Sequence, residues 1–330
     1  HRVDRRQRQM CIRDRACTAT AYLCGVKAND ATIGLNAKAT RANCDDGNDE
    51  SKKVESIAAW AIKAGKDAGF VTTTRVTHAS PTGVYGHVTD RDWEGNVAVE
   101  TDNCDSNVVD DIAEQLIYSE VGKKLKVAMG GGSKNFIDRS FNEHGSGNRT
   151  DRKNLIDEWK AMDPARTYVN NRQDLMNLDP KNVKQVLGLF NDNHIPYHLD
   201  VQRDGLQETM PSLTDMTLKA IDIMSQSNEG YFLFVEGGRI DHGHHKNEAK
   251  YAIDETVEFS KAIEAAMKKI NVEDTLVVVT ADHGHVMSLS GYAVSILNQI
   301  YQILNTPIDI RSEEMIFSEW LAQVAITFLT

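Results

Sequence analysis

Two stretches of this chain join an apolar run to a cluster of acidic and histidine side chains. One cluster follows the apolar run 231–235, and the other follows the apolar run 276–280. Their members are Glu236, Asp241, His245, Asp282 and His283. Carboxylate and imidazole side chains are the usual protein ligands of zinc. The sequence therefore predicts a metal site to which both stretches contribute.

The spacing within each cluster limits how it can hold a metal. Asp241 and His245 are four residues apart, so a helical turn or a tight loop can bring both to one ion. The adjacent Asp282 and His283 can chelate only from an irregular loop, which Gly284 permits. Any one of these residues alone is more often a hydrogen-bonding loop residue, but two such clusters together favour the metal site. Three further histidines are interpreted as supporting residues rather than ligands: His242, His244 and His285.

A third polar cluster follows the β-branched run 70–76, where His78 and Ser80 lie in a turn-rich loop. A hydroxyl together with a carboxylate suits magnesium. Arg91, a little further on, is by itself more often a surface arginine. Next to a metal site it would serve as a bidentate clamp for an oxyanion such as phosphate.

The elements between these clusters predict how they are positioned. Helices are expected at 51–68, 108–118, 213–224 and 248–270, and strands at 70–76, 126–129, 231–235 and 276–280. The segments 18–26 and 183–190 are compatible with either type. This alternation predicts an α/β fold, a three-layer α/β/α sandwich around a largely parallel sheet. Ligands of such sheets bind beyond the carboxyl ends of the strands, so the three clusters should converge there if their strands are neighbours.

Length and composition exclude several classes of protein. The chain has 330 residues, of which 41% are hydrophobic, which is enough for one large domain or at most two. The net charge of −11 argues against a nucleic-acid-binding surface. No apolar stretch reaches the roughly 18 residues that a membrane span needs, and no signal peptide is visible. The arginine-rich segment 1–15 favours a disordered end over a binding arm.

Cysteines and glycines give weaker signals. None of the five cysteines forms a C-x-x-C pair, which makes a thiolate zinc site improbable. Cys44 and Cys104 lie in polar, acidic segments where a disulfide can form, and Cys24 is expected to be a buried thiol. The glycine run 130–132 follows a predicted strand but lacks the spacing of a phosphate-binding loop, so a plain turn is favoured.

Three motifs carry a resemblance to a known family: TTTRVTHASPTGVYGH with DRDW, FLFVEGGRIDHGHH, and VVVTADHGHV. Together with TATAYLCGVK and the MGGG loop, they resemble the animal-type alkaline phosphatases over residues 14–294. The resemblance implies hydrolysis of phosphomonoesters by a serine nucleophile with two zinc ions and one magnesium ion. It also implies a homodimer at an extracellular or cell-surface location. Segment 1–13 and the tail 295–330 are set apart as unrelated to the family.

Specific roles follow from the resemblance residue by residue. Asp241 and His245 resemble ligands of the first zinc, and Asp282 and His283 resemble ligands of the second. The magnesium ligands would be Ser80 and Glu236, with His78 acting through water. Arg91 resembles the arginine that binds the phosphate group of the substrate.

The sequence also departs from the family pattern. Where the family has D-S-A-x-T-A-T-A, this chain places Arg15 at the serine position, and an arginine cannot attack phosphorus. No counterpart is expected here for an upstream aspartate that bridges zinc and magnesium, or for a third histidine on the first zinc. Calcium is not expected either. At its site Glu158 and Phe190 match, but Asn191 and Met210 replace acidic residues.

Three hypotheses remain open at this point. The first is a phosphomonoesterase of the alkaline phosphatase type whose chain is incomplete or chimeric. The second is a non-catalytic relative that binds metal or phosphate, which Arg15 favours. The third is another enzyme of the same metalloenzyme superfamily, such as a phosphodiesterase or a phosphate-transferring mutase. The close match of the THASPTGVYGH motif argues against the third.

Overall fold

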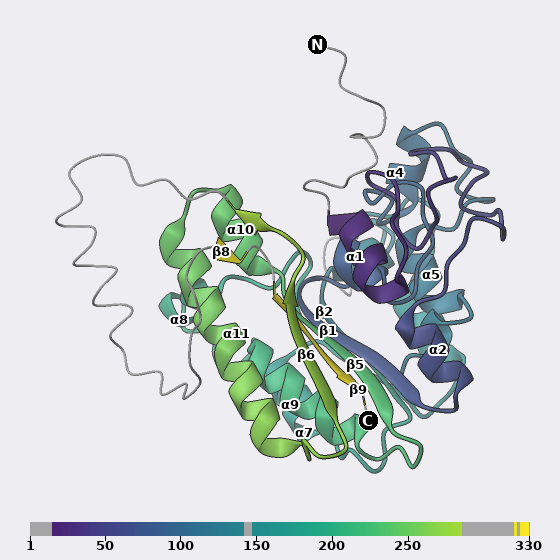
Figure 1. Cartoon of the computed structure of the whole chain (residues 1–330). Coiled ribbons are helices and arrows are strands. Elements are labelled where there is room, and N and C mark those ends of the chain that lie inside the picture. Colours follow the sequence, from purple (N-terminus) through teal and green to yellow (C-terminus); the bar gives the residue numbers. More distant parts are fainter. Residues whose placement is uncertain (1–14, 142–146, 286–319, 322–323, 330) are drawn as a thin grey trace, which may run out of the picture.

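The computed structural model of the chain describes residues 15–141, 147–285, 320–321 and 324–329. Its centre is a seven-stranded sheet, and Figure 1 shows α2 and α5 on one face and α9 and α11 on the other. The predicted three-layer α/β/α sandwich is therefore confirmed. Segment 1–13 and most of the tail 295–330 lie outside the described residues, so the proposed division of the chain into segments stays a prediction.

The strands of the main sheet follow the spatial order β3 (Arg166–Val169), β4 (Gln185–Leu189), β2 (Val127–Gly131), β1 (Asp67–Arg75), β5 (Tyr231–Gly237), β9 (Val324–Leu329) and β6 (Leu276–Ala281). A separate ladder pairs β7 (Gly284–His285) with β8 (Trp320–Leu321).

The helices in chain order are α1 (Arg15–Cys24), α2 (Ile57–Lys63), α3 (Ala79–Thr82), α4 (Asn96–Thr101), α5 (Ile112–Tyr118), α6 (Leu155–Ala161), α7 (Arg172–Asn177), α8 (His198–Arg203), α9 (Leu213–Met224), α10 (Arg239–His245) and α11 (Ala249–Lys269). Two short 3₁₀ helices, η2 (Gly122–Lys124) and η3 (Ser133–Phe136), flank β2.

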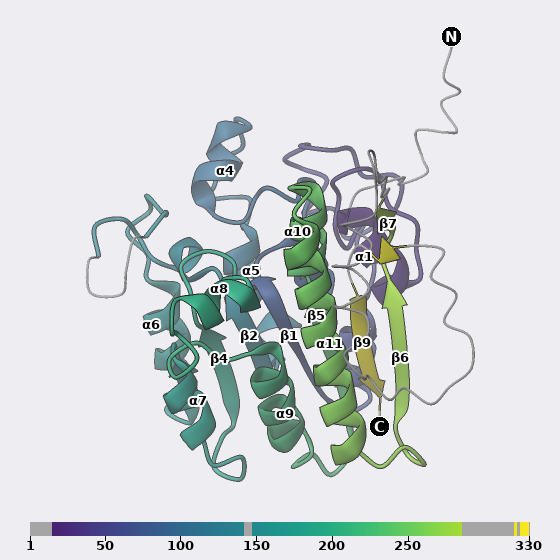
Figure 2. The same ribbon diagram turned by 90° about the vertical axis from the view of Figure 1, so that its left-hand side faces the viewer.

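Side-chain alternation along the strands builds two hydrophobic cores. Phe232 and Phe234 of β5 face the core beneath α1, α2 and α5. Leu233 and Val235, the residues between and after them, face the core beneath α9 and α11. Because both faces of β5 are covered, the strand is apolar without interruption until Glu236. Figure 2 shows α9 and α11 lying across one face of the sheet.

The sheet is parallel except for β9, which lies between β5 and β6 and runs antiparallel to both. From the sequence, the whole tail 295–330 is expected to lie outside the catalytic domain, and no strand is predicted within it. Residues 324–329 nevertheless pair in register with the whole of β6 and with residues 232–237 of β5. The two strands that carry the main metal-ligand clusters are therefore not direct neighbours.

The apolar run 276–280 does not form a buried strand. β6 forms as predicted, but Leu276 is 60% exposed, and Val278 and Val279 are about half exposed. The strand lies at the edge of the sheet and pairs with β9 alone among the described strands. An apolar run of this length does not reveal whether anything covers it.

The first predicted helix is much shorter than 51–68. α2 begins only after Ser56, whose side chain accepts a hydrogen bond from the amide of Ala59, and it ends at Lys63. Gly69, the residue after the predicted helix, lies inside β1. A Cβ there would approach the carbonyl oxygen of Val127 to 2.8 Å, so glycine permits close pairing of β1 with β2.

Other boundaries shift for local reasons. α5 begins at Ile112 rather than at 108, because Asp111 and Glu114 form a capping box at its N-terminus. The two ambiguous segments resolve into helix α1 and strand β4. Of the glycines predicted to form a turn, Gly130 and Gly131 are the last residues of β2, and only Gly132 leaves the strand. The amide of Gly132 donates to the carbonyls of Asn191 and Asn193.

The predictions for Cys44, Cys104 and Cys24 are confirmed. Cys44 and Cys104 form a disulfide that links two loops across 60 residues of sequence. Cys24 is a free, buried thiol. Among the described residues, no helix combines the length and the apolar character that a membrane span requires.

A fully buried arginine ties the loop at 147–153 to the N-terminus of α5. Nη1 of Arg149 lies 2.8 Å from Oδ2 of Asp111, and Nη2 lies 2.5 Å from Oδ2 of Asp151 and 3.3 Å from Oε1 of Glu114. Lys153 adds a further bond to Glu114. The side chains of Arg149 and Asp111 are both 0% exposed, so each depends on its partners rather than on water.

Candidate metal centre

The carboxyl ends of β1, β5 and β6 bring the predicted site residues together. Glu236 is the penultimate residue of β5, and Asp241 lies in the first turn of α10. The two glycines between them allow a tight connection. A Cβ on Gly238 would approach Cγ2 of Thr74 to 2.4 Å, so glycine lets β5 end against β1. Asp241 is 1% exposed and lies at the centre of the site.

The outer side of Asp241 faces histidines. Its Oδ1 lies 2.6 Å from Nε2 of His285, 3.4 Å from Nε2 of His245 and 3.8 Å from Nε2 of His283. Asp241, His283 and His285 each offer a ligand atom, and these atoms lie within 4.8 Å of one another. His245 is less enclosed, with its side chain 66% exposed. Two carboxylate–histidine clusters from different strands therefore converge on one oxygen atom.

The inner side of Asp241 faces Arg15. Nη2 of Arg15 forms an ion pair with Oδ2 of Asp241, and Nη1 lies 3.1 Å from Nε2 of His242 and 3.4 Å from Nδ1 of His78. Arg15 is only 4% exposed because α1 begins with it, beneath the site. Burial lowers its pKa to about 10, while the carboxylates of Glu236 and Asp282 act to raise it. The guanidinium is therefore charged at neutral pH.

Glu236 lies in a pocket of hydroxyl groups. Thr72 and Thr74 of β1 both donate to Oε2 of Glu236, with Oγ1 of Thr74 at 3.1 Å. Ser80 of α3 also hydrogen bonds to Glu236. Burial raises the pKa of Glu236, and these hydroxyls and Arg15 oppose the shift. Carboxylate and hydroxyl oxygens close together match the preference of magnesium.

Asp282 follows β6 directly and is held close to His283. Its Oδ2 is buried 3.5 Å from Nε2 of His283 and has no hydrogen-bond partner within the described residues. Burial raises the pKa of Asp282 to about 7, against the opposing charge of Arg15. A buried carboxylate oxygen without a hydrogen-bond donor is stabilised by a bound cation, so Asp282 is suited to metal binding.

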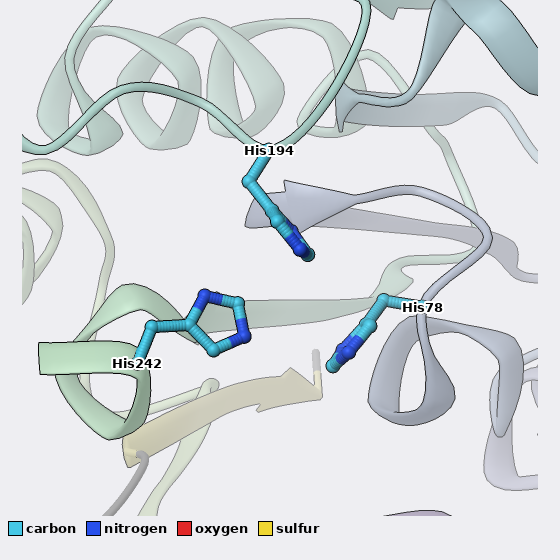
Figure 3. A group of neighbouring side chains, drawn as sticks. All are labelled: His78, His194 and His242. Atoms are coloured by element: carbon cyan, nitrogen blue, oxygen red, sulfur yellow. The ribbon is translucent and has the colours of Figure 1, made fainter. Parts of the chain in front are cut away.

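His78 belongs to a second group of imidazoles, together with His194 and His242. Figure 3 shows these three rings pointing toward one another from the start of α3, a loop and α10. Their ligand atoms lie within 4.8 Å of one another. The sequence did not predict His194 as a site residue. It follows β4 in the same way that the other clusters follow their strands, but the segment 183–190 was left open between helix and strand.

Arginines surround this second group. Nη1 of Arg75 lies 2.6 Å from Nε2 of His194, and Nη1 of Arg239 lies 2.8 Å from Nδ1 of His242. Nη2 of Arg91, the predicted phosphate clamp, lies 3.4 Å from Nε2 of His78. Burial, reinforced by neighbouring cationic groups, lowers the pKa of all three histidines. The second group is therefore neutral and lies in a positively charged part of the site.

The residues present fit a metal on one side of Asp241 and not on the other. The outer side supplies carboxylate and imidazole donors in the combination that zinc prefers. On the inner side, a cation bound to Oδ2 of Asp241 would have to displace the guanidinium of Arg15. The Glu236 pocket has the right donor types for magnesium, but the charge of Arg15 also acts on it.

The chain is similar in sequence to known proteins. A sequence model described as alkaline phosphatase matches residues 1–318. The chain is 46% identical over 288 residues to the membrane-bound alkaline phosphatase of Bombyx mori, covering 86% of this chain and 52% of that protein. It is 43% identical over 291 residues to the human tissue-nonspecific isozyme, covering 85% and 54%. The chain thus spans about half the length of these relatives.

The fold comparison agrees. The structure of Thermus thermophilus alkaline phosphatase superposes with a TM-score of 0.67 at 26% identity, covering 88% of this chain and 52% of that one. The alkaline phosphatase of a psychrophilic Shewanella species superposes with a TM-score of 0.59 at 24% identity, covering 82% and 54%. The shared sheet, the convergent carboxylate–histidine clusters and the sequence match lead to one conclusion: this chain belongs to the alkaline phosphatase family.

Proposed function

We propose that this site is that of a metal-dependent phosphomonoester hydrolase of the alkaline phosphatase type. The observation that supports the proposal most directly is the convergence of Asp241, His245, Asp282 and His283 at the ends of β5 and β6, with Arg91 beside His78. The side chains that could bind metal and the arginine that could bind an oxyanion therefore lie in the same part of the fold. Phosphoryl transfer needs both.

The chain's own residues have distinct tasks in this proposal. Arg91 donates to the phosphoryl oxygens, and neutral His78 beside it orients the guanidinium through the contact to Nε2. Arg239 contacts His242 and stacks over the ring of Tyr197 at 3.8 Å, which fixes the side of the site next to α10. When bound, the metal ions would supply Lewis-acid stabilisation of charge on the phosphoryl oxygens.

Arg15 separates this chain from an active phosphatase. It stands at the position of the family's serine nucleophile, and it is paired with a metal-ligand carboxylate. A guanidinium can neither form nor release a phosphoester bond. This contact favours the second candidate, a metal- or phosphate-binding homologue without turnover, for the chain in its present sequence.

The finer proposal concerns the metals of an intact family site. Two zinc ions would use Asp241 with His245, and Asp282 with His283. One magnesium ion would use Ser80, Glu236 and His78, the last through water. Phosphomonoesters would be the substrates of the whole protein, and a homodimer is expected of its intact form. The Cys44–Cys104 disulfide supports an oxidising, extracellular or cell-surface location.

Binding of inorganic phosphate tests this proposal without requiring turnover. With zinc and magnesium present, we expect Arg91→Ala to weaken phosphate binding roughly 10- to 100-fold, because hydrogen bonds between charged groups contribute about 1.5–3 kcal/mol. Isothermal titration calorimetry measures the change. Arg203→Ala is the matched control, since Arg203 pairs with Asp200 and Asp204 on the surface of α8. Equal affinity of the two variants for phosphate would remove the support for a phosphate-handling site.

A further inference from the structure

The two oxygens of Asp241 face opposite charges. Oδ2 is paired with the guanidinium of Arg15, whereas Oδ1 faces Nε2 of His285 at 2.6 Å and Nε2 of His283 at 3.8 Å. A single carboxylate therefore separates a cationic inner side from an imidazole-rich outer side.

On the inner side, the guanidinium already acts as a counter-ion. Glu236 and Asp282 are both buried, and both act electrostatically on Arg15. The guanidinium of Arg15 also contacts His78 and His242, so its position is fixed by several contacts rather than by the ion pair alone. A second cation among these carboxylates would be repelled by a fixed positive charge in contact distance. Arg15 is thus placed where it opposes inner metal binding.

On the outer side, the group that contains His283 and His285 also contains the carboxylate of Asp241, which attracts a cation. The rings of His244 and His285 stack at 5.0 Å, and the ring of His245 meets that of His285 edge-on at 4.7 Å. These contacts orient His285 with its Nε2 toward Asp241. One carboxylate and two imidazoles within 4.8 Å form the donor set of a three-ligand zinc site.

The group His78, His194 and His242 offers as many imidazoles but is a poor cation site. Arg15, Arg75, Arg91 and Arg239 each lie against a ring nitrogen of this group. Glu94 neutralises Arg75, but Arg15 and Arg239 act electrostatically on both His194 and His242. Geometry alone would allow a metal at either group of ligands, whereas charge distinguishes the two.

We infer that the guanidinium of Arg15 takes the place of a metal ion on the inner side of Asp241, so that this chain binds a single zinc ion on the outer side, at Asp241, His283 and His285. The inference deepens the proposed function, because it rests on the same site being a metal centre. It differs from the family expectation in stoichiometry, and it assigns His285 as a ligand rather than a support.

Zinc stoichiometry tests the inference. The purified chain is treated with a chelator, equilibrated with zinc chloride, dialysed and analysed by elemental mass spectrometry. We expect one zinc ion per chain, and none after His285→Ala. Arg15→Gln removes the charge but keeps hydrogen-bonding groups, and it should raise the count to two. Arg15→Lys keeps the charge and should leave the count at one.

Several outcomes would overturn the inference. Two or more zinc ions in the unmodified chain would show that Arg15 does not exclude the inner metal, and no bound zinc would remove the outer site. Equal counts for Arg15→Gln and Arg15→Lys would show that charge is not the cause. Near-ultraviolet circular dichroism checks that each variant is folded, and the count for the unmodified chain is decisive by itself. Loss of phosphate binding with one zinc bound would refute the proposed function and leave this inference intact.

Discussion

The unmodified chain is expected to hydrolyse p-nitrophenyl phosphate no faster than buffer, even at alkaline pH with zinc and magnesium added. Removing the nucleophile of a covalent mechanism typically lowers kcat by about 10⁴- to 10⁶-fold, and the proposed function places Arg15 at the nucleophile position. The same side chain is paired with Asp241, so it removes a metal-ligand oxygen as well as a hydroxyl. Release of p-nitrophenolate, followed at its absorbance maximum, measures the rate.

Arg15→Ser alone should not restore full activity. From the family resemblance we expect no counterpart in this sequence for the bridging aspartate or for the third histidine on the first zinc. Arg15→Ala is the matched control, because it removes the guanidinium without supplying a hydroxyl. Any gain in Arg15→Ser over Arg15→Ala measures what the serine contributes. Robust turnover by the unmodified chain, or complete rescue by the single substitution, would refute this account.

Arg149→Leu should lower the free energy of unfolding by about 3–5 kcal/mol, the usual cost of removing one partner from a buried ion pair. The reason is that Asp111, also 0% exposed, would lose its cation while it still caps α5. Chemical denaturation with urea measures the change. Arg172→Leu is the control. Arg172 pairs with Asp215 at 2.8 Å but is partly exposed, so a loss of about 0–1 kcal/mol is expected.

A double variant refines this prediction. Asparagine is as good an N-cap as aspartate, so Asp111→Asn keeps the cap of α5 and removes the charge. Combined with Arg149→Leu, it should recover part of the lost stability, because no unpaired carboxylate remains at that position. If Arg149→Leu changed stability by less than 1 kcal/mol, the buried network would not hold the loop to α5 as described.

The sequence predicted the layers of the fold because the apolar runs and the amphipathic helices have clear periods. It predicted α9 to the residue, since Ser212 caps that helix and the apolar face is continuous. It failed for the segment 51–68, where apolar spacing suggested one long helix. The helix is instead limited by Ser56, which caps its start, and by Gly65, which follows its end with a φ of 81°. Both are local signals, and the apolar spacing alone did not take them into account.

The candidate site shows the same limit. Strand-end positions identified Glu236, Asp241 and His283 because each lies within about six residues of the end of an apolar run. His194 obeys the same rule but was not predicted. The apolar segment before it is too short for its periodicity to distinguish a strand from a helix. The contact of Arg15 with Asp241 joins residues 226 positions apart, and only the folded chain brings it out.

The placement of β9 has a consequence for local unfolding. β6 pairs with β9 alone among the described strands, and β9 in turn pairs with β5. If β9 detaches from the sheet, β6 loses its strand partner and moves together with Asp282 and His283. Asp241 stays on α10, which packs against α11. The two halves of the metal centre therefore belong to separate cooperative units whose amide hydrogens can exchange at different rates. A metal ion held by both halves would join these units into one.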